Sequence, residues 1–263
     1  MCLRDLVDQA HERGFVESDE HEMIHNVFEL GDTLVHELMV HRTDMVWIEK
    51  DKTLRQGLSL ALRSGFSRIP VVGTGPDNII GIVYVKDLAR RALDHHEAEQ
   101  TEIVEQHMRP ATFVPEIKMA DELLKEMQRN QIHLAIVVDE YGGTAGIITI
   151  EDIIEEIVGE IEDEFDDGED DFVWLTPDKA RANASLHIED LADELKIEIN
   201  ESDFEDVDTI GGLMAQKLGR VPIAGSTVSL HGWSITSERP LGRRRRISSV
   251  LIERLEKEIE DHE

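Results

Sequence analysis

The chain has 263 residues, of which 40% are hydrophobic, so it is long enough for two or three modest domains with buried cores. Asp and Glu total 57 against 27 Lys and Arg, which gives a formal net charge of -30. A surface this acidic repels other polyanions, so we expect no nucleic-acid partner. The single cysteine, Cys2, excludes a disulfide within the chain and favours a reducing, cytoplasmic setting.

Residues 1–35 are expected to form an N-terminal helical linker. Apolar residues recur at helical spacing over residues 3–30, and Gly14 interrupts the pattern, which predicts one or two helices. Ser18 stands before a cluster of acidic residues, so it is expected to cap the second helix, and Gly31 is expected to end it.

The next region repeats one pattern twice, about 65 residues apart, with helix, strand, turn, strand and helix in the same order. We bound the two copies as residues 36–99 and 100–162. The matching stretches are residues 46–49, 67–72 and 81–88 in the first copy and 112–115, 133–138 and 146–153 in the second, and each copy is expected to contain two short apolar strands separated by a turn. One copy alone exposes too much apolar surface, so the two copies are expected to bury their strands and helices against each other.

Residues 163–171 belong to an acidic run that cannot bury itself, so we expect a solvated linker there. A third domain is expected over residues 172–257. Its pattern predicts strands at 172–175, 227–230, 233–236 and 247–252 and helices at 188–195 and 209–217. His231 and Gly232 are expected to make a tight hairpin turn between two of these strands.

The repeated pattern resembles a tandem pair of CBS (cystathionine β-synthase-type) domains. The second copy, over residues 138–146 and 149–161, is similar to a signature of CorC/HlyC proteins, and residues 64–71 of the first copy are similar to another. Residues 207–213 resemble the opening of that family's C-terminal transporter-associated domain. One position departs from the family pattern, because His41 stands where a proline is usual, so the turn there is expected to be looser.

The resemblance implies an α+β fold, with a CBS pair of β-α-β-β-α repeats, N-terminal linker helices and a small α+β C-terminal domain. It implies a regulatory module of a magnesium and cobalt efflux protein that binds ATP, or another adenine nucleotide, with Mg2+. It also implies a homodimer through the CBS repeats and a membrane transport domain in cis or in trans. The expected location is the cytoplasm, at the cytosolic face of the membrane if the chain is part of a membrane-spanning protein, and no enzyme activity is expected.

A nucleotide cleft needs an apolar slot for adenine, a carboxylate for the ribose hydroxyls, and hydroxyls and positive charge near the phosphates. The two repeats can supply these groups together, and by resemblance this set is the family's ATP site. Its members are Thr43, Phe66, Ser67, Arg68, Ile69, Pro70, Thr149 and Asp152. Each also has a structural explanation, since Thr149 and Asp152 can form a helix cap and the apolar residues can belong to the core.

The pseudo-symmetric second site is expected to be degenerate. Asp87 matches Asp152, but Tyr84 stands where Thr149 stands in the other copy. His133 and Ala135 lie in the stretch equivalent to residues 67–69, which has no arginine in the second copy. We therefore expect one competent nucleotide site per chain.

Two other functions remain as alternatives. The chain could be an interaction scaffold that dimerises and docks a partner without a ligand. It could also be a zinc hydrolase, because His21, Glu22 and His25 fit the H-E-x-x-H pattern. Against the hydrolase, the motif lies in a short amphipathic helix, and no third ligand follows it at a recognised spacing, so no metal site is expected.

Overall fold

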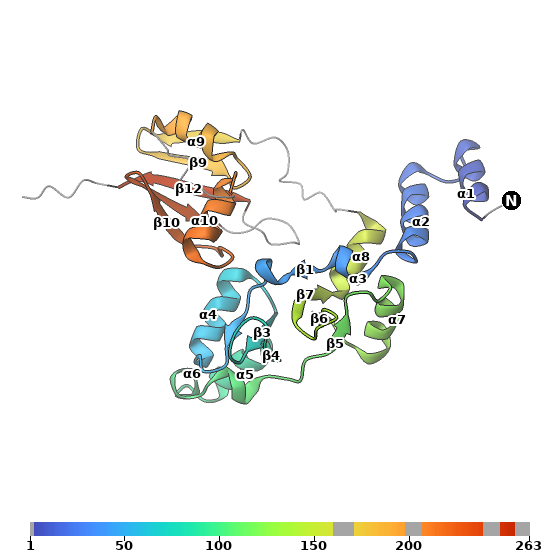
Figure 1. The fold of residues 1–263 in the computed structure, drawn as a ribbon, viewed down its shortest axis with the longest axis horizontal. Coiled ribbons are helices and arrows are strands. Elements are labelled where there is room, and N and C mark those ends of the chain that lie inside the picture. The colour runs from blue at the N-terminus through green and yellow to red at the C-terminus, as the bar shows by residue number, and fades with distance from the viewer. Residues whose placement is uncertain (1–2, 160–170, 198–206, 239–247, 256–263) are drawn as a thin grey trace, which may run out of the picture. The chain divides into compact units, whose positions relative to one another are not determined.

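A computed structural model of the chain describes residues 3–159, 171–197, 207–238 and 248–255. The chain divides into two compact units, the first made of residues 1–57 and 68–162 and the second of residues 163–263 together with 58–67. The first unit carries the sheets of both repeats, and the second carries the C-terminal sheet (Figure 1). No helix among the described residues is long and apolar enough to cross a bilayer.

Two helices, α1 (Leu3–Glu12) and α2 (Ser18–Leu30), confirm the expected N-terminal pair. Gly14 lies between them with a φ of +73°, a conformation that glycine adopts without strain. The expected cap is wrong by one residue, because Glu17 and not Ser18 holds the N-cap position. The Glu20 carboxylate reaches back to accept a hydrogen bond from the Glu17 backbone N–H at 3.1 Å, which satisfies one of the free amide groups of the first turn.

The first repeat contains a three-stranded sheet in the order β2-β3-β4, with β2 parallel to β3 and β3 antiparallel to β4. Its elements are β2 (Ile48–Glu49), α4 (Leu54–Ser64), β3 (Arg68–Val72), β4 (Ile79–Tyr84) and α5 (Val85–Asp94). Two short segments, α6 (Ala98–Thr101) and η2 (Val104–His107), lead to the second repeat. The β-α-β-β-α order predicted from the sequence is therefore confirmed.

The second repeat has the same order and forms a four-stranded sheet, β1-β7-β6-β5. Its own elements are β5 (Phe113–Pro115), α7 (Ala120–Asn130), β6 (Leu134–Val138), β7 (Thr144–Thr149) and α8 (Ile150–Val158). The extra strand, β1 (Val40–His41), follows the short helix α3 (Val35–Leu38) and precedes the first repeat. It nevertheless pairs antiparallel with β7, so the chain adds its first strand to the sheet of the second copy before it forms the first.

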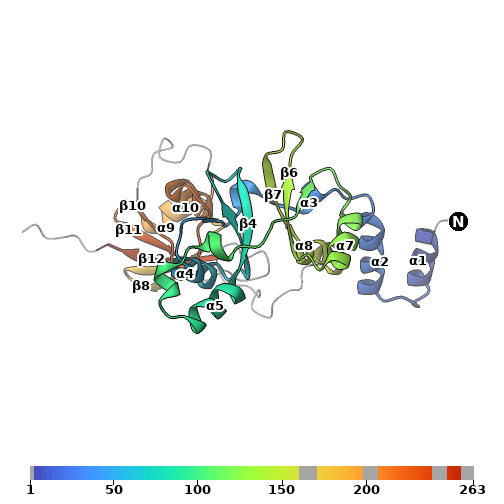
Figure 2. The same ribbon diagram turned by 90° about the horizontal axis from the view of Figure 1, so that it is seen from below.

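A shared apolar core joins the two repeats. The residues Val72, Ile79 and Ile82 of the first sheet belong to one buried cluster with Leu134 and Ile136 of the second. Figures 1 and 2 show the β3–β4 and β6–β7 hairpins side by side. The prediction that the two copies bury apolar surface against each other is confirmed, and removal of this surface from water is the main force that holds the pair together.

The C-terminal unit contains a five-stranded antiparallel sheet in the order β10-β11-β12-β9-β8. Its elements are β8 (Phe172–Thr176), β9 (Lys179–Asn183), α9 (Ile188–Leu195), α10 (Ile210–Leu218), β10 (Thr227–Leu230), β11 (Trp233–Ser237) and β12 (Ser249–Arg254). Apolar residues of both helices share a core with the sheet. The expected acidic linker lies mostly outside the described residues.

One strand of this sheet, β9, was not predicted from the sequence. Its buried positions are held by the small residues Ala180 and Ala182, while Lys179 and Arg181 alternate with them, so the apolar pattern is weak. The predicted hairpin turn is confirmed, because His231 and Gly232 both have positive φ values, +43° and +85°, between paired Leu230 and Trp233.

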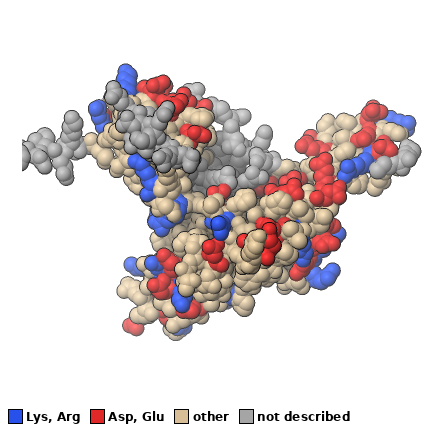
Figure 3. Space-filling model, viewed as in Figure 1, with Lys and Arg blue, Asp and Glu red and all other residues tan. Residues whose placement is uncertain are grey.

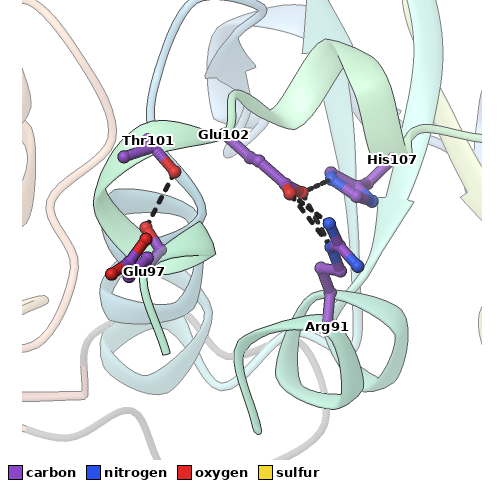
Figure 4. Close-up of polar contacts among 5 residues, drawn as sticks. All are labelled: Arg91, Glu97, Thr101, Glu102 and His107. Carbon is purple, nitrogen blue, oxygen red and sulfur yellow. Dashed lines mark hydrogen bonds and ion pairs between the residues drawn. The ribbon is translucent and has the colours of Figure 1, made fainter. Parts of the chain in front are cut away.

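A polar network ties α5 to the segment that leads into the second repeat (Figure 4). The Glu102 carboxylate accepts a hydrogen bond from Arg91 Nε at 2.9 Å and lies 2.6 Å from His107 Nε2. These contacts, with that of Arg91 the largest, lower the pKa of Glu102 from 4.5 to about 2. Beside them, the Thr101 hydroxyl donates to the Glu97 carbonyl at 2.8 Å at the end of α6.

We expect Glu102→Gln to lower the melting temperature at neutral pH, because the variant loses the ionised acceptor between Arg91 and His107. The folded-state pKa is below the unfolded one, so the stabilisation is complete above pH 4.5 and is lost as the pH falls through about 2. Thermal melts of both proteins from pH 7 to pH 2 should therefore converge at the acid end. Glu105→Gln is the control, since Glu105 lies 4.0 Å from its exposed partner Lys50 and their ion pair should add little stability. A difference in melting temperature between wild type and Glu102→Gln that stays constant with pH would contradict this account.

Candidate functional site

The junction between β7 and α8 brings together two of the residues predicted for the nucleotide site. Thr149 ends β7 and is the N-cap of α8, and Asp152 stands in the first turn of that helix. The Asp152 Oδ2 atom accepts hydrogen bonds from the Thr149 backbone N–H and from the Thr149 hydroxyl, both at 2.7 Å. The Asp152 backbone N–H donates to Thr149 Oγ1 at 3.2 Å. These reciprocal bonds make a capping box, so the structural explanation of the pair holds in this state of the chain.

The Asp152 carboxylate is half-buried, and its hydrogen bonds from Thr149 do not offset the cost of its removal from water. Burial raises the pKa of Asp152, and the neighbouring carboxylates of Glu155 and Glu151 raise it further. The two hydrogen bonds from Thr149 oppose this shift and do not cancel it. A ligand that donates hydrogen bonds to this carboxylate, as a sugar diol does, would relieve the cost of keeping it ionised.

Arg68 opens β3, where it lies opposite Tyr84 in the hairpin. Its guanidinium carbon is 5.5 Å from the centroid of the Tyr84 ring. The Nε atom of Arg68 is buried and has no hydrogen-bond partner among the residues that the structure describes. A buried donor without an acceptor costs free energy, and a guanidinium N–H matches the oxygen of a phosphate or carboxylate. The position therefore fits an anionic group.

The equivalent junction of the first repeat is neutralised by the chain itself. Asp87 matches Asp152, and its Oδ2 atom accepts a hydrogen bond from Arg109 Nε at 2.8 Å. The Arg109 guanidinium carbon also lies 4.2 Å from the Tyr84 ring centroid. Asp87 and Tyr84, two of the four residues predicted for the degenerate site, are therefore engaged by one arginine, which leaves a poor place for a ribose.

The two repeats differ here because of one position. The backbone of Arg109 pairs with Ile82, with N···O distances of 2.9 and 2.8 Å. In the other copy, Val40 pairs with Ile147 at the equivalent place. The same backbone pairing thus presents an arginine to one junction and a short apolar side chain to the other.

The other two residues predicted for the degenerate site, His133 and Ala135, differ in their exposure to solvent. His133 is exposed, and its Nδ1 atom lies 4.0 Å from a carboxylate oxygen of Glu151. Ala135 is completely buried in the sheet core of the second repeat. Neither residue offers a specific contact for a nucleotide.

Two residues predicted to form the adenine slot are core residues in the structure. Ile69 is 1% exposed, and Pro70 is also buried, both within β3. In the loop before β3, Phe66 is half-buried and donates its backbone N–H to Ser64 Oγ at 3.4 Å, while Ser67 is exposed. The side chains of Ile69 and Pro70 therefore stabilise the sheet in this state of the chain.

Thr43 lies apart from the Thr149–Asp152 junction. It is exposed in the single turn η1 (Arg42–Asp44), directly after β1. Because β1 runs antiparallel to β7, with His41 opposite Gly146, the chain beyond His41 heads toward Thr144 at the far end of β7. Thr144 and Thr149 are separated by roughly 17 Å along the strand.

Sequence reasoning missed two polar residues that the fold brings to predicted sites. Arg109 could have been found, since residues 108–110 hold the place in the second copy that precedes its first strand, as residues 39–41 do in the first. Asp8 was missed because it precedes the motif, and only residues after the motif were considered as a third ligand beside His21 and His25. The turn between α1 and α2 places Asp8, from upstream, against both imidazoles.

Comparison with known proteins identifies both parts of the chain. The CBS domain family matches residues 35–94 and 103–159, and the transporter associated domain of CorC and HlyC proteins matches residues 176–256. A UPF0053 protein of Mycobacterium tuberculosis is 48% identical over 264 residues, which cover 99% of this chain and 60% of that protein. The chain thus spans about three fifths of the length of that relative.

Other relatives carry more specific names. The magnesium and cobalt efflux protein CorC of Salmonella typhimurium is 37% identical over 232 residues, covering 88% of this chain and 77% of that protein. The solved CBS domain of a bacterial CNNM/CorC family Mg2+ transporter is 45% identical, with a TM-score of 0.57 over 61% of this chain and 96% of that one. A second such structure, in complex with ATP, is 47% identical with a TM-score of 0.51, over 54% of this chain and 99% of that one.

The matched domains follow one another in the order seen in the fold, with the CBS pair first and the transporter-associated domain after it. The identity to CorC proteins extends over most of both chains. This chain therefore belongs to the CorC/HlyC family of CBS-domain proteins.

Proposed function

We propose that this chain is a regulatory module of a magnesium and cobalt efflux protein and that it binds one ATP with Mg2+ in its CBS pair. The observation that carries the proposal is the buried Nε atom of Arg68, which has no hydrogen-bond partner within the described part of the chain, in the same repeat pair as the partly desolvated carboxylate of Asp152. The first group lacks an acceptor among these residues, and the donors of the second do not offset its burial. A nucleotide supplies phosphate oxygens for the first and ribose hydroxyls for the second.

Three residues carry the proposed contacts. Asp152 receives hydrogen bonds from the ribose diol, and the Thr149 hydroxyl turns from the Asp152 carboxylate toward the ligand. Arg68 pairs with the phosphates. Thr43, Phe66 and Ser67 stay as contacts predicted from the sequence, and Ile69 and Pro70 would act through their backbone groups. The site includes no nucleophile or acid–base pair, so we propose binding without hydrolysis.

The negative charge of the chain explains why we propose that the nucleotide binds together with Mg2+. The chain carries a net charge of -30, and acidic side chains gather over α2 and α8 on the face drawn in Figure 3. Such a surface repels a bare nucleotide polyanion. Mg2+ bound to the phosphates neutralises part of that charge, and Mg2+ prefers phosphate and water oxygens to a dedicated cage of protein ligands.

The relatives guide the remainder of the proposal. CorC of Salmonella typhimurium is named a magnesium and cobalt efflux protein, and an ATP complex is known for a related CBS domain. We propose that this chain dimerises through its CBS repeats and serves a membrane transport domain, in cis or in trans, from the cytosolic side. Nucleotide occupancy can shift such a transporter only by as much as the nucleotide's affinity differs between its two states.

A matched pair of substitutions tests the site. Asp152→Asn keeps an acceptor for the α8 cap and loses the charge that the ribose hydroxyls need, so the Kd for ATP should rise about 10- to 100-fold. Asp87→Asn makes the same change at the equivalent position, where Arg109 already occupies the carboxylate, so the Kd should change less than about 3-fold. Isothermal titration calorimetry with ATP and Mg2+ measures both, and thermal melts without ligand check folding.

Wild-type protein should bind one ATP per chain. Saturation at about 100 times the Kd should stabilise it by about 2.7 kcal/mol in the same melts. Equal effects of the two substitutions would overturn the assignment of one competent site. No heat and no thermal shift with wild type would favour the ligand-free scaffold instead.

A second substitution isolates the phosphate contact. Arg68→Gln should raise the Kd for ATP at least about 10-fold and leave that for adenosine nearly unchanged, because only ATP offers phosphates to the guanidinium. Arg109→Gln is the control, since Arg109 lies over the same Tyr84 ring and is paired with Asp87. If Arg68→Gln weakened adenosine as much as ATP, the role of Arg68 would be structural.

A further inference from the structure

The hairpin of α1 and α2 builds a second polar cluster, in which Asp8, His21 and His25 meet. His21 and His25 are four residues apart on α2, so one turn of helix places both imidazoles on the same face. Asp8 comes from α1, which lies beside α2 in Figures 1 and 2. The Nε2 atoms of His21 and His25 lie 2.8 and 2.9 Å from a single oxygen, Oδ1 of Asp8.

These three atoms can close around a metal ion with little movement. One ligand atom from each residue lies within 4.8 Å of both others. A tetrahedral Zn2+ with bonds of about 2.0–2.1 Å holds its ligand atoms about 3.3 Å apart. The two short contacts to Asp8 Oδ1 would therefore lengthen by about 0.4–0.5 Å, and the ligand nitrogens of His21 and His25, which lie within 4.8 Å of each other, would take up the same spacing.

An ion can also reach the cluster. The Asp8 side chain is 48% exposed, and those of His21 and His25 are 26% and 30% exposed.

Apolar packing does not account for the position of α1. Helix α1 has no buried residue, and two of its leucines, Leu3 and Leu6, are 61% and 46% exposed. Its contacts with α2 include the Asp8 bonds, a His11 ring that stacks on His21 at 4.5 Å, and the Arg4 guanidinium 5.5 Å from the Phe28 ring. A bond from metal to Asp8 would fix the helix far more firmly than these exposed contacts do.

We propose that Asp8, His21 and His25 form a binding site for a divalent transition-metal ion of the zinc class, which joins α1 to α2, with water in the remaining coordination position. The donor set of two imidazoles and one carboxylate suits Zn2+ and disfavours Mg2+, which takes oxygen ligands. The site shares no residue with the proposed nucleotide site. Glu22, which follows His21, is exposed and is not part of the cluster.

Metal-free protein titrated with Zn2+ tests the site. We expect one Zn2+ per chain, with a rise in melting temperature that Mg2+ does not reproduce. Asp8→Asn and His25→Ala should each raise the Kd more than about 100-fold, because loss of a mere second-shell partner costs about 10- to 100-fold. Two controls should bind Zn2+ as wild type does: Glu22→Gln, which removes the neighbouring carboxylate, and His96→Ala, which removes an exposed histidine outside the cluster.

Two further measurements separate a lost ligand from a lost fold. Circular dichroism of the metal-free variants should match that of the wild type, since His21 and His25 lie on a helix that is also packed on α8. X-ray absorption of the Zn2+-loaded wild type should show two imidazoles and oxygen ligands. Zn2+ affinity that survives Asp8→Asn and His25→Ala, or absorption without two imidazoles, would overturn the proposal.

Discussion

The structure of the repeat pair depends on the burial of one hairpin against another. Neither the β3–β4 hairpin nor the β6–β7 hairpin can bury its apolar face alone, and Ile82, Leu134 and Ile136 are removed from water only where the two copies meet. Tyr84 and Ile147 border the same cluster, close to the ends of β4 and β7. The apolar core therefore positions the two strand-to-helix junctions, where Asp87 and Asp152 lie.

The duplicated sequence gives two similar strand-to-helix junctions, one in each repeat. The side chain of one arginine, Arg109, makes them different. In the first repeat, Arg109 satisfies Asp87 and covers Tyr84, so the carboxylate already has its partner. In the second repeat, Val40 stands at the equivalent backbone position, and the hydrogen bonds of Asp152 to the described residues are those of its own helix cap. Since an internal cation competes with any ligand for the same carboxylate, the pseudo-symmetric fold is consistent with one nucleotide site per chain.

The capping box between Thr149 and Asp152 bears on how a ligand would bind. The Thr149 hydroxyl donates a hydrogen bond to the Asp152 carboxylate. A nucleotide therefore has to displace this hydrogen bond before its own hydroxyls can bind the carboxylate. The backbone N–H of Thr149 can keep its bond to Asp152 throughout, which preserves the start of α8. The exchange costs little because burial already disfavours the ionised carboxylate with the donors it has.

Helix α8 also provides a physical connection to the N-terminal hairpin. Asn26 of α2 donates a hydrogen bond to the Ile157 carbonyl of α8 at 3.3 Å, and α8 begins at the Thr149 junction. The cluster of Asp8, His21 and His25 and the proposed nucleotide site thus lie on elements that contact each other. Energetic coupling between them is limited to the difference that each ligand makes in the packing of α2 and α8.

The sequence by itself determined the order of the elements, the duplication and the position of the carboxylates. Periodicity located the helices and strands of both repeats, and the three-residue spacing from Thr149 to Asp152 was enough to foresee a cap. These features are local, because they depend on residues within a few turns or one strand of each other. The strand β9 was not predicted, because its buried residues are alanines and its apolar pattern is weak.

Only the tertiary structure decided which side chains meet. The placement of β1 beside β7, the pairing of Arg109 with Asp87, and the meeting of Asp8 with His21 and His25 join segments that their own local patterns do not connect. The burial of Ile69 and the orphaned donor of Arg68 likewise follow from the packing of whole sheets. Such contacts result from the summed burial of many residues, and no single motif in the chain encodes that sum.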